Sequence, residues 1–590
     1  MILSMTCDVA IVGGGPAGST IGALLRKYAP HLRVTIVERE AFPRDHVGES
    51  HLPAISDILD EMGVWDKVEA ADFPIKIGGT YRWGRTDELW DFEFIPGQTF
   101  ENKPRPEKFE GQRKQTAFQV DRSIYDTILL DHAESLGCTV LQEMKVRKVI
   151  VDGDRIQGLE LVDGSGANRV EEGEILTSKY YIDGSGESGL LRRALGVEIT
   201  APTALRNIAV WDYWQDAEWA VTIGNGGTRI QVLSLGWGWL WFIPITPTRT
   251  SIGLVMPAQY LKNSGHTAEQ LYTKAIQTEP LVSQLVKSAR REGDLQATKD
   301  WNFLSDRLVG ENWFLAGDSC GFADPILSAG MTLAHTSGKK IAYTIAELER
   351  GEHSPVWLRK QYEDGHRAQI KHHMQFADYW YSANGRFTDL QEYCSEIAKS
   401  AGLELDAQAA FRWLATGGFA TEAPGFARAL SYRVGGIKFI TKLFSGEGAE
   451  WVAARTNRFK LNLQGATEEL YPLYKDGRIE PVQSFQRGDK TLPIVFVYWL
   501  IYNGLQRESD ADTLMRMWME VARGNRMFAS AKEAYSAIIE GLEGMIAEGW
   551  IIADVNPGRP FLPIETPEES GAMHPNRDNV PIQVPLASNG

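Results

Sequence analysis

A glycine-rich turn near the N-terminus constrains the fold of this chain more than any other feature. An apolar segment at residues 8–12 leads into Gly13-Gly14-Gly15-Pro16-Ala17-Gly18, and an apolar helical pattern continues to about Lys27. A second apolar segment, Val34–Val37, ends at the acidic residue Glu38, about twenty positions beyond the glycines. This order of strand, turn, helix and strand is the context in which a G-x-G-x-x-G pattern predicts dinucleotide binding.

Each part of the turn has a physical role in that prediction. Gly13 makes the tight turn, Gly15 lets the backbone approach the pyrophosphate, and Gly18 allows the helix to pack closely on the strand. The N-terminus of the helix directs backbone N–H groups and a positive dipole end toward the phosphates. Glu38 is placed to accept hydrogen bonds from the ribose hydroxyls.

Length and composition bound the class of protein. A chain of 590 residues is too long for one hydrophobic core, so we expect two or three domains. The fractions of hydrophobic (43%) and charged (23%) residues are those of a globular protein, and a net charge of −16 argues against nucleic-acid binding. The four cysteines lie far apart, without the spacing of a metal site or a disulfide framework. With no signal-peptide pattern and no apolar run long enough to span a bilayer, the sequence predicts a cytoplasmic protein.

Changes of pattern along the chain predict an α/β fold with three regions. Residues 1–350 should form a Rossmann-type dinucleotide-binding domain interleaved with a β-sheet substrate domain, which has strands within 208–255. Residues 351–463 have a helical pattern, and residues 464–590 indicate a small winged-helix-like module with a partly disordered tail. We expect residues 100–117 to form an exposed, charged loop.

The C-terminal module is expected to pack against the substrate side and not to bind DNA. Residues 541–550 should lead from a helix into a hairpin, the pattern that suggests the winged helix. Residues 491–590 carry 7 Lys and Arg against 13 Asp and Glu. The basic surface that a DNA-binding module needs is therefore missing.

Four further segments accompany the glycine turn. Trp239-Leu240-Trp241-Phe242-Ile243-Pro244 has the composition of a buried strand that ends at a proline. Asn312–Ser319 is an apolar strand that ends in Gly-Asp, and residues 322–330 lead into a long helix whose first N–H groups can stabilise negative charge. The segment Phe42–Ser50 contains P-R-x-x-x-G-E-S. We expect Lys76 to lie in a loop that follows it, where most lysines are solvated surface residues.

Together these motifs resemble those of the flavin-dependent halogenases, which combine G-x-G-x-x-G with W-x-W-x-I-P. The resemblance covers roughly residues 6–350 and, more loosely, the aromatic stretch Phe376–Phe387. It implies FAD, used as FADH2 after reduction by a separate flavin reductase, and hypohalous acid made from chloride or bromide. The oxidant would travel through a tunnel to Lys76, which would transfer the halogen to an electron-rich aromatic or activated carbon as an ammonium donor or as a haloamine. The Trp239–Pro244 strand would separate flavin from substrate and so prevent ordinary monooxygenation.

The resemblance also implies roles for individual residues. The catalytic residues would be Lys76 and Ser328, and the backbone N–H groups of Ala329 and Gly330 would hold the halide. FAD would be bound by Gly13, Gly15, Ala17, Gly18, Glu38, Arg39, Arg44, Glu49, Ser50, Arg122, Asp318, Pro325 and Gly330. The partition between flavin and substrate would consist of Trp239, Trp241, Ile243 and Pro244. No metal is expected, because His366, His372 and His373 lack a carboxylate partner pattern and have the character of helix-surface or pocket residues.

The substrate class and two alternative functions stay open on the sequence. The tryptophan-specific branch carries Glu immediately before the motif serine, where this chain has Leu327. The resemblance is therefore closer to the branch that acts on phenols, pyrroles and carrier-bound or acyl substrates in secondary metabolite biosynthesis. The first alternative is a flavin monooxygenase, hydroxylase or reductase of the same fold, which would oxidise NADPH by itself. The second is a non-catalytic flavin-binding redox sensor, which would bind FAD without turnover.

Overall fold

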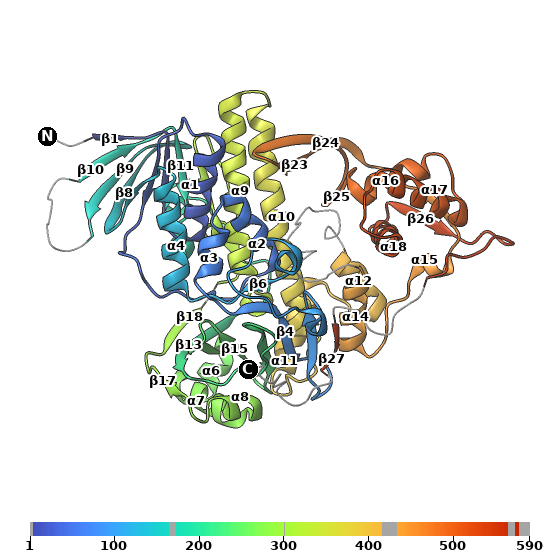
Figure 1. Cartoon of the computed structure of the whole chain (residues 1–590), viewed down its shortest axis with the longest axis horizontal. Helices are drawn as coiled ribbons and strands as arrows, with labels where there is room; N and C mark the ends of the chain where they lie inside the picture. The colour runs from blue at the N-terminus through green and yellow to red at the C-terminus, as the bar shows by residue number, and fades with distance from the viewer. Residues whose placement is uncertain (1–3, 165–172, 300, 416–433, 565–572, 577–590) are drawn as a thin grey trace.

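A parallel sheet carries the glycine turn in this computed structural model, which describes residues 4–164, 173–299, 301–415, 434–564 and 573–576 (Figure 1). The five strands are, in order, β20 (Trp313–Leu315), β11 (Tyr180–Asp183), β2 (Val9–Val12), β3 (Val34–Val37) and β7 (Thr139–Leu141). Helix α1 (Pro16–Tyr28) follows β2, and α4 (Arg122–Ser135) and α9 (Ala329–Arg350) pack against α1. The predicted strand–turn–helix–strand unit is confirmed, and the turn lies at the carboxyl ends of the parallel strands.

A second, larger sheet is interleaved with this domain and forms the predicted substrate domain. Its main path is β17-β13-β16-β15-β14-β4-β5-β27, which begins at β17 (Arg290–Arg291) and ends at β27 (Met573–Pro575). Strands β18 (Gln296–Lys299) and β6 (Ala117–Phe118) are attached at the side. The principal strands are β13 (Asn207–Gln215), β16 (Arg249–Pro257), β15 (Trp239–Pro244), β14 (Gly227–Ser234), β4 (Ile75–Arg82) and β5 (Trp90–Glu93). Helices α6 (Ala258–Asn263), α7 (Ala268–Thr278) and α8 (Pro280–Leu285) lie beside this sheet (Figure 1). A smaller four-stranded sheet extends from the other side of the nucleotide-binding domain (Figure 1). Its order is β1 (Ser4–Thr6), β10 (Glu174–Thr177), β9 (Arg155–Asp163) and β8 (Met144–Asp152).

The expectation that Lys76 lies in a loop is wrong, because this residue is the second of strand β4. The strand pairs in parallel with β14, where Lys76 lies opposite Thr228, and in antiparallel with β6 (Ala117–Phe118). Gly78 and Gly79 follow, and a β-carbon on Gly78 would overlap the carbonyl oxygen of Phe92 on β5. Glycines that suggest a loop in the sequence here allow two strands to approach closely.

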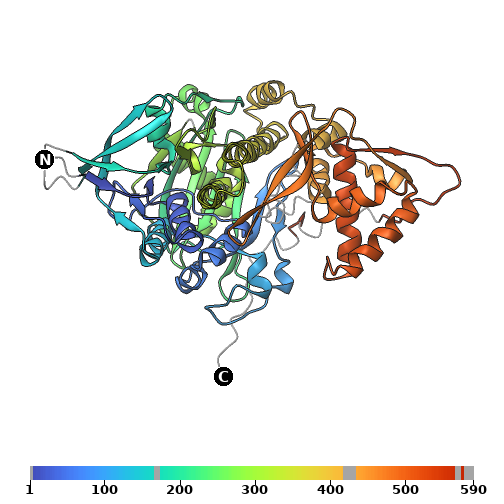
Figure 2. The same ribbon diagram turned by 90° about the horizontal axis from the view of Figure 1, so that it is seen from above.

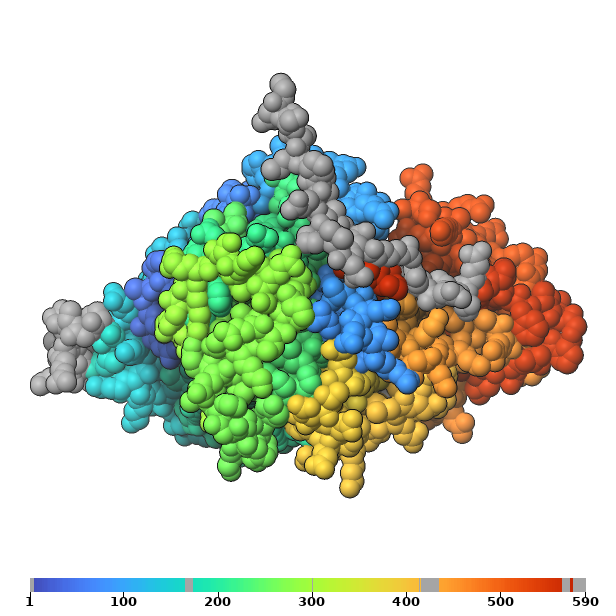
Figure 3. Space-filling model, turned by 90° about the horizontal axis from the view of Figure 1, so that it is seen from below, coloured from blue at the N-terminus to red at the C-terminus, as the bar shows by residue number. Residues whose placement is uncertain are grey.

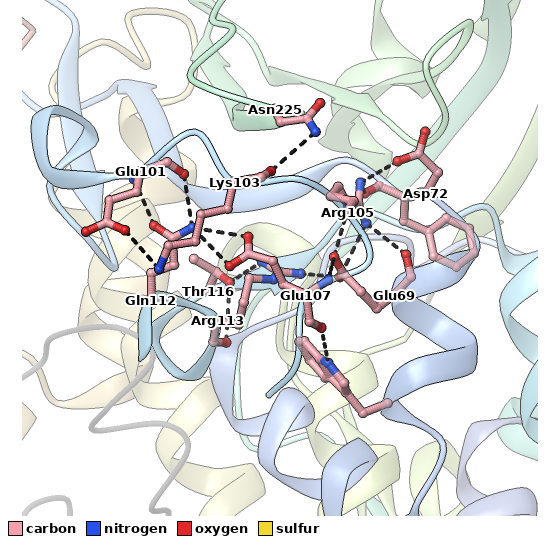
Figure 4. A network of polar contacts seen from close by, with 12 residues as sticks. Glu69, Asp72, Glu101, Lys103, Arg105, Glu107, Gln112, Arg113, Thr116 and Asn225 are labelled. Carbon is pink, nitrogen blue, oxygen red and sulfur yellow. Dashed lines mark hydrogen bonds and ion pairs between the residues drawn. The ribbon is translucent and has the colours of Figure 1, made fainter. Parts of the chain in front are cut away.

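Most of the charged segment 100–117 is exposed, as expected, but it is anchored at one end by a buried ionic network (Figure 4). Arg113 is fully buried and its guanidinium donates to the Glu69 carboxylate over 2.6 Å. The same carboxylate accepts a hydrogen bond of 3.0 Å from Arg105 Nε. Thr116, also buried, accepts from Arg113. The segment therefore enters β6, the neighbour of Lys76, from a fixed direction.

The region after α9 is helical, as predicted. It contains α10 (Pro355–Ser382), α11 (Gln391–Ala401), α12 (Ala407–Ala415) and α14 (Val434–Ser445). His366, His372 and His373 are buried on α10, so of the two expected settings, helix surface or pocket, the helix surface is excluded. Within the described residues, no group of three or more potential ligand side chains could hold a metal ion.

The C-terminal module combines helices with short strands and sends a long hairpin back to the first domain. Its elements are β22 (Arg458–Leu461), β23 (Thr467–Lys475), β24 (Arg478–Arg487), β25 (Lys490–Pro493), α16 (Phe496–Leu505), α17 (Ala511–Gly524), α18 (Ala531–Ala547) and β26 (Ile551–Asp554). The β23–β24 hairpin reaches across to α9 (Figure 2). At its tip the Gly477 carbonyl oxygen accepts a hydrogen bond from Arg350. The winged-helix comparison stays a prediction.

The hairpin expected after residue 550 is not formed locally. Instead β26 pairs in antiparallel with β22, about ninety residues upstream, and Phe459 of β22 lies in the core of the module. We therefore propose that the module begins near residue 450 and not at 464.

A strand from the C-terminal tail completes the large sheet. β27 (Met573–Pro575) pairs in antiparallel with β5, where Met573 lies opposite Phe92 and is buried. Figure 3 shows the segment that contains β27, in red, beside the blue surface of the N-terminal half. His574 Nε2 lies 3.2 Å from a Glu93 carboxylate oxygen. Most of the tail that we expect to be disordered lies outside the described residues.

The helices of the described ranges include none that is long and apolar enough to cross a membrane.

Candidate active site

One large cavity, of about 740 Å³, lies between the two sheets and the start of α9. It brings together most of the residues named from the sequence, although their individual roles remain predictions. These are Gly13, Gly15, Ala17, Glu38, Arg39, Arg44, Glu49, Ser50, Arg122, Trp239, Trp241, Ile243, Asp318, Pro325, Ser328, Ala329 and Gly330. Three others, Gly18, Lys76 and Pro244, do not line the cavity.

The three glycines of the turn differ in what a side chain would meet. A β-carbon on Gly13 would overlap the Gly184 carbonyl oxygen, and one on Gly18 would overlap the carbonyl oxygen of Gly13. At Gly15 the nearest atom would be Arg44 Nη2, 3.6 Å away. The packing of the chain thus requires Gly13 and Gly18, whereas the space at Gly15 belongs to the cavity. Such an open cradle at a helix N-terminus fits the pyrophosphate of FAD.

Glu38 supports the turn as well as facing the cavity. One carboxylate oxygen accepts from the Gly14 N–H over 2.7 Å, and the other accepts from the Glu40 N–H over 3.0 Å. The carboxylate that was expected to bind the ribose therefore also fixes the backbone of the turn. Both oxygens retain a lone pair for a ribose hydroxyl.

Two arginines supply positive charge to the cavity wall. Arg122 is buried and donates two hydrogen bonds, of 2.7 and 2.8 Å, to the Asp126 carboxylate. Arg44 lies 3.3 Å from the same carboxylate. Two guanidinium groups share this buried carboxylate, and the second counter-charge, Glu40, is 44% exposed and lies 3.7 Å from Arg44 Nε. Guanidinium groups placed in this way in a cavity wall suit a bound anion such as the pyrophosphate.

Two carboxyl groups in the cavity are held partly in their neutral form by desolvation. Burial raises the pKa of Asp318, at the end of β20, to about 6. It raises the pKa of Glu49 to about 7, although Glu49 accepts a hydrogen bond of 2.9 Å from the Tyr213 hydroxyl. A protonated carboxyl at either position can donate a hydrogen bond to a cofactor oxygen or nitrogen.

The Lys76 amine lies directly behind two serines of the cavity wall. It is 3% exposed, and Nζ donates to Ser50 Oγ (2.7 Å), to the His51 carbonyl oxygen (3.0 Å) and to Ser328 Oγ (3.4 Å). Burial lowers the pKa of Lys76 to about 7. No carboxylate of the described residues forms an ion pair with this amine, so nothing offsets the cost of removing the ammonium from water. Such a lysine is a mixture of ammonium and neutral amine near neutral pH.

The tryptophan strand forms one wall of the cavity through alternate residues. Trp239, Trp241 and Ile243 of β15 line it, whereas Leu240 and Phe242 point to the opposite face and pack in a separate core with α7 and α8. Pro244 ends the strand and does not reach the cavity. The predicted buried strand is confirmed, and only one of its faces can meet a cofactor.

Sequence reasoning missed several residues around this site. Tyr213 contacts Glu49, His51 contributes its carbonyl oxygen to Lys76, and Asp324 caps the short helix at 325–327. Tyr381 comes from α10 and bonds to Trp239. Tyr213 carries no local motif, and Tyr381 lies in the aromatic stretch Phe376–Phe387, which resembles the family only loosely. The one available signal was Asp324, because Asp before Pro is a frequent N-cap pattern.

The fold and the cavity define an FAD-binding protein. The family model described as "FAD binding domain" matches residues 6–377, which is more than half of the chain. The 1H-pyrrole-2-carbonyl-(peptidyl-carrier protein) chlorinase of Pseudomonas fluorescens is 31% identical over 394 residues, which cover 65% of this chain and 85% of that protein. The tryptophan 2-halogenase of Chondromyces crocatus is 31% identical over 355 residues, which cover 60% of this chain and 63% of that protein.

Solved structures extend the likeness. The myxobacterial chondrochloren halogenase CndH superposes with a TM-score of 0.57 at 28% identity, over 64% of this chain and 83% of that chain. The flavin-dependent halogenase CmlS gives a TM-score of 0.69 at 24% identity, over 93% and 96%, so its fold also includes the C-terminal region. This chain belongs to the flavin-dependent halogenases, and it is an FAD-dependent enzyme that halogenates with FADH2.

Proposed function

We propose that this enzyme passes halogen through Lys76 to an electron-rich aromatic substrate, a pyrrole or a phenol. The observation that carries the proposal is the amine of Lys76, which is buried, has no carboxylate partner among the described residues and bonds to two serines of the flavin cavity. A lysine with a pKa of about 7 is a nucleophile at neutral pH, unlike a surface lysine.

FAD supplies the reduced flavin that reacts with oxygen to give the oxidant for the halide. For that cofactor the chain offers the open cradle at Gly15, the arginines Arg44 and Arg122, and the half-buried carboxyl of Asp318. We infer that the halide, chloride or bromide, binds at the backbone N–H groups of Ala329 and Gly330. These residues begin α9 and line the cavity, so the positive dipole end of a 22-residue helix faces the anion.

The transfer of halogen to Lys76 needs no oxidant other than hypohalous acid. The neutral amine attacks the halogen of hypohalous acid, an N–halogen bond forms, the halogen–oxygen bond breaks, and the hydroxide takes the amine proton and leaves as water. The three oxygen contacts of Nζ accommodate both protonation states. An ammonium donates to all three, and a neutral amine donates to two and accepts from a serine hydroxyl.

The substrate and the reductase are inferred from the relatives and from the chain itself. The Pseudomonas relative acts, by its name, on pyrrole-2-carbonyl bound to a peptidyl-carrier protein. The second relative is a tryptophan 2-halogenase. Because Leu327 replaces the Glu of the tryptophan-specific branch, we favour a pyrrole or phenol, free or tethered to a carrier protein. The chain carries one dinucleotide fingerprint, so we infer that a separate flavin reductase provides FADH2.

The test is a product assay with a panel of phenols and pyrroles, each offered free and as a carrier-bound thioester. FAD, a flavin reductase with NADH, and either chloride or bromide are added, and products are analysed by mass spectrometry. The expected result is a halogenated product that requires the reductase. Hydroxylated product without halogen, or NADPH oxidation by the isolated protein, would instead support a monooxygenase.

The rate of halogenation should rise with pH through about 7 and then level off. Burial lowers the pKa of Lys76 from 10.5 to about 7, so the ammonium predominates below this pH and the neutral amine above it. Only the neutral amine has the lone pair that attacks hypohalous acid. Product formation is measured between pH 5.5 and 9 beside oxygen consumption, which reports oxidant formation alone.

A second group titrates in the same range, since burial raises the pKa of Glu49 to about 7. The variant Glu49→Gln removes that titration and should still show the rise, whatever its absolute rate. A halogenation rate that falls through pH 7 while oxygen consumption stays constant would favour the ammonium as the active form.

A further inference from the structure

A chain of hydrogen bonds links two walls of the flavin cavity from behind. Trp239 Nε1 donates to the Tyr381 hydroxyl over 2.7 Å, and this hydroxyl donates to Asp324 Oδ1 over 3.2 Å. Trp239 belongs to β15, Tyr381 to α10, and Asp324 to the turn before α9. Each of the three side chains is at most 2% exposed.

The two ends of the chain lead to the cavity, whereas its middle does not. Trp239 lines the cavity, and so do Pro325 and Ile326, which follow Asp324. Tyr381 and Asp324 themselves are not among the lining residues. The side chains of Tyr381 and Asp324 therefore do not face the cavity, where a flavin would bind.

Asp324 also fixes the backbone that leads to the proposed halide site. Its Oδ1 caps the short helix Pro325–Leu327 by accepting from the Ile326 N–H over 3.0 Å, and its Oδ2 accepts from Trp301 Nε1 over 3.4 Å. Ser328 follows with a φ of 56°, a left-handed conformation that is unfavourable for serine, and α9 begins at Ala329. A strained residue needs surrounding structure that holds it in place, and the capped turn provides this.

We propose that Tyr381 is a positioning residue for halogenation, which holds the tryptophan strand and the halide-binding turn at a fixed separation through Trp239 and Asp324. The inference rests on the proposed placement of the halide at Ala329 and Gly330. Loss of the hydroxyl leaves the indole N–H of Trp239 buried without an acceptor, so the strand moves or admits water. The turn then no longer presents its N–H groups at a fixed distance from the partition.

The test is the variant Tyr381→Phe, which keeps the ring and removes both hydrogen bonds. We expect unchanged FAD content and oxygen consumption, a halide KM raised about tenfold, and a smaller share of the consumed oxygen recovered as halogenated product. The missing share should appear as hydrogen peroxide. Steady-state assays over a halide series give these values for the purified full chain with a flavin reductase.

Tyr379→Phe is the matched control, since it removes an equally buried tyrosine hydroxyl two residues earlier on α10. That hydroxyl bonds to Thr441 and not to the cavity wall. The control should leave the halide KM within about twofold of the wild-type value. If both variants shift halide KM equally, the effect of Tyr381 is general loosening of α10 and the proposal is wrong.

A double-mutant cycle tests whether the chain acts as one unit. Asp324→Ala removes the oxygen that accepts from Tyr381, together with the cap of the short helix, and it also serves if Tyr381→Phe fails to fold. The double variant should have a halide KM close to that of Asp324→Ala alone, because Tyr381→Phe then has no bond to Asp324 left to break. Additive effects, or an unchanged halide KM in Tyr381→Phe, would overturn the proposal. Absence of saturable halide dependence in the wild type would instead contradict the proposed function.

Discussion

The variant Lys76→Met should bind FAD and consume oxygen like the wild type but form halogenated product on the order of a thousandfold more slowly. Methionine occupies the space of the buried aliphatic stem of Lys76 and lacks only the amine. The substitution therefore opens little new space beside β4. Formation of the oxidant takes place in the flavin cavity, which Lys76 does not line. The measurement is product by mass spectrometry and hydrogen peroxide by a coupled assay, at matched FAD occupancy.

Lys76→Arg provides the chemical control for this experiment. A guanidinium retains the charge and the donors to Ser50 and Ser328, but it stays protonated and cannot become the neutral amine. It should therefore fail to restore activity if a haloamine forms. Substantial rescue would favour a hydrogen-bonding role, and near wild-type turnover by Lys76→Met would remove the lysine from the mechanism.

The second large effect is expected at the glycine turn, where Gly15→Val should abolish FAD binding without unfolding the protein. The valine side chain would extend into the space that the pyrophosphate requires, and affinity should fall by about a hundredfold or more. The chain itself has room, because a β-carbon at Gly15 meets nothing nearer than 3.6 Å. Because Gly15 is the N-cap of α1, its replacement by valine should lower the free energy of unfolding of the apo protein by about 1 kcal/mol. Flavin absorbance of the purified protein measures FAD binding, and thermal unfolding of the apo protein measures its stability.

Gly18→Ala distinguishes loss of the cofactor site from loss of the fold. Its methyl group would overlap the carbonyl oxygen of Gly13, so this variant should unfold at a lower temperature even without FAD. Gly15→Ala should give an intermediate loss of FAD affinity. Stoichiometric flavin in purified Gly15→Val would show that the pyrophosphate lies elsewhere.

The parts of the fold that the sequence predicts well depend on local signals. The glycine turn is specified within one strand and one helix, and the tryptophan strand is specified by composition and its terminal proline. The cavity residues follow from these motifs because the motifs have a fixed order along the chain. Nothing comparable marks Tyr213, and the aromatic stretch that contains Tyr381 does not indicate its partner, so both reach the site only through the tertiary fold.

The failures share one physical cause, which is pairing between segments that are far apart in the sequence. Lys76 is followed by Gly78 and Gly79, which suggest a loop until their contact with β5 is known. Arg113 belongs to a charged and mostly exposed segment, and its own burial depends on Glu69, a distant partner. Likewise β26 pairs with β22 and not with a neighbouring strand. Local patterns carry no information about such partners.

The pairing of β27 with β5 has a consequence for how the protein is made. Residues 93 and 573 are about 480 positions apart, so at ribosomal rates the edge of β5 waits roughly half a minute to a minute and a half for its partner. Throughout that time a strand edge next to the lysine strand is open to other nascent chains. Slow codons or truncation before residue 573 would lengthen this exposure, so yield of soluble enzyme should depend on the tail more than its few contacts suggest.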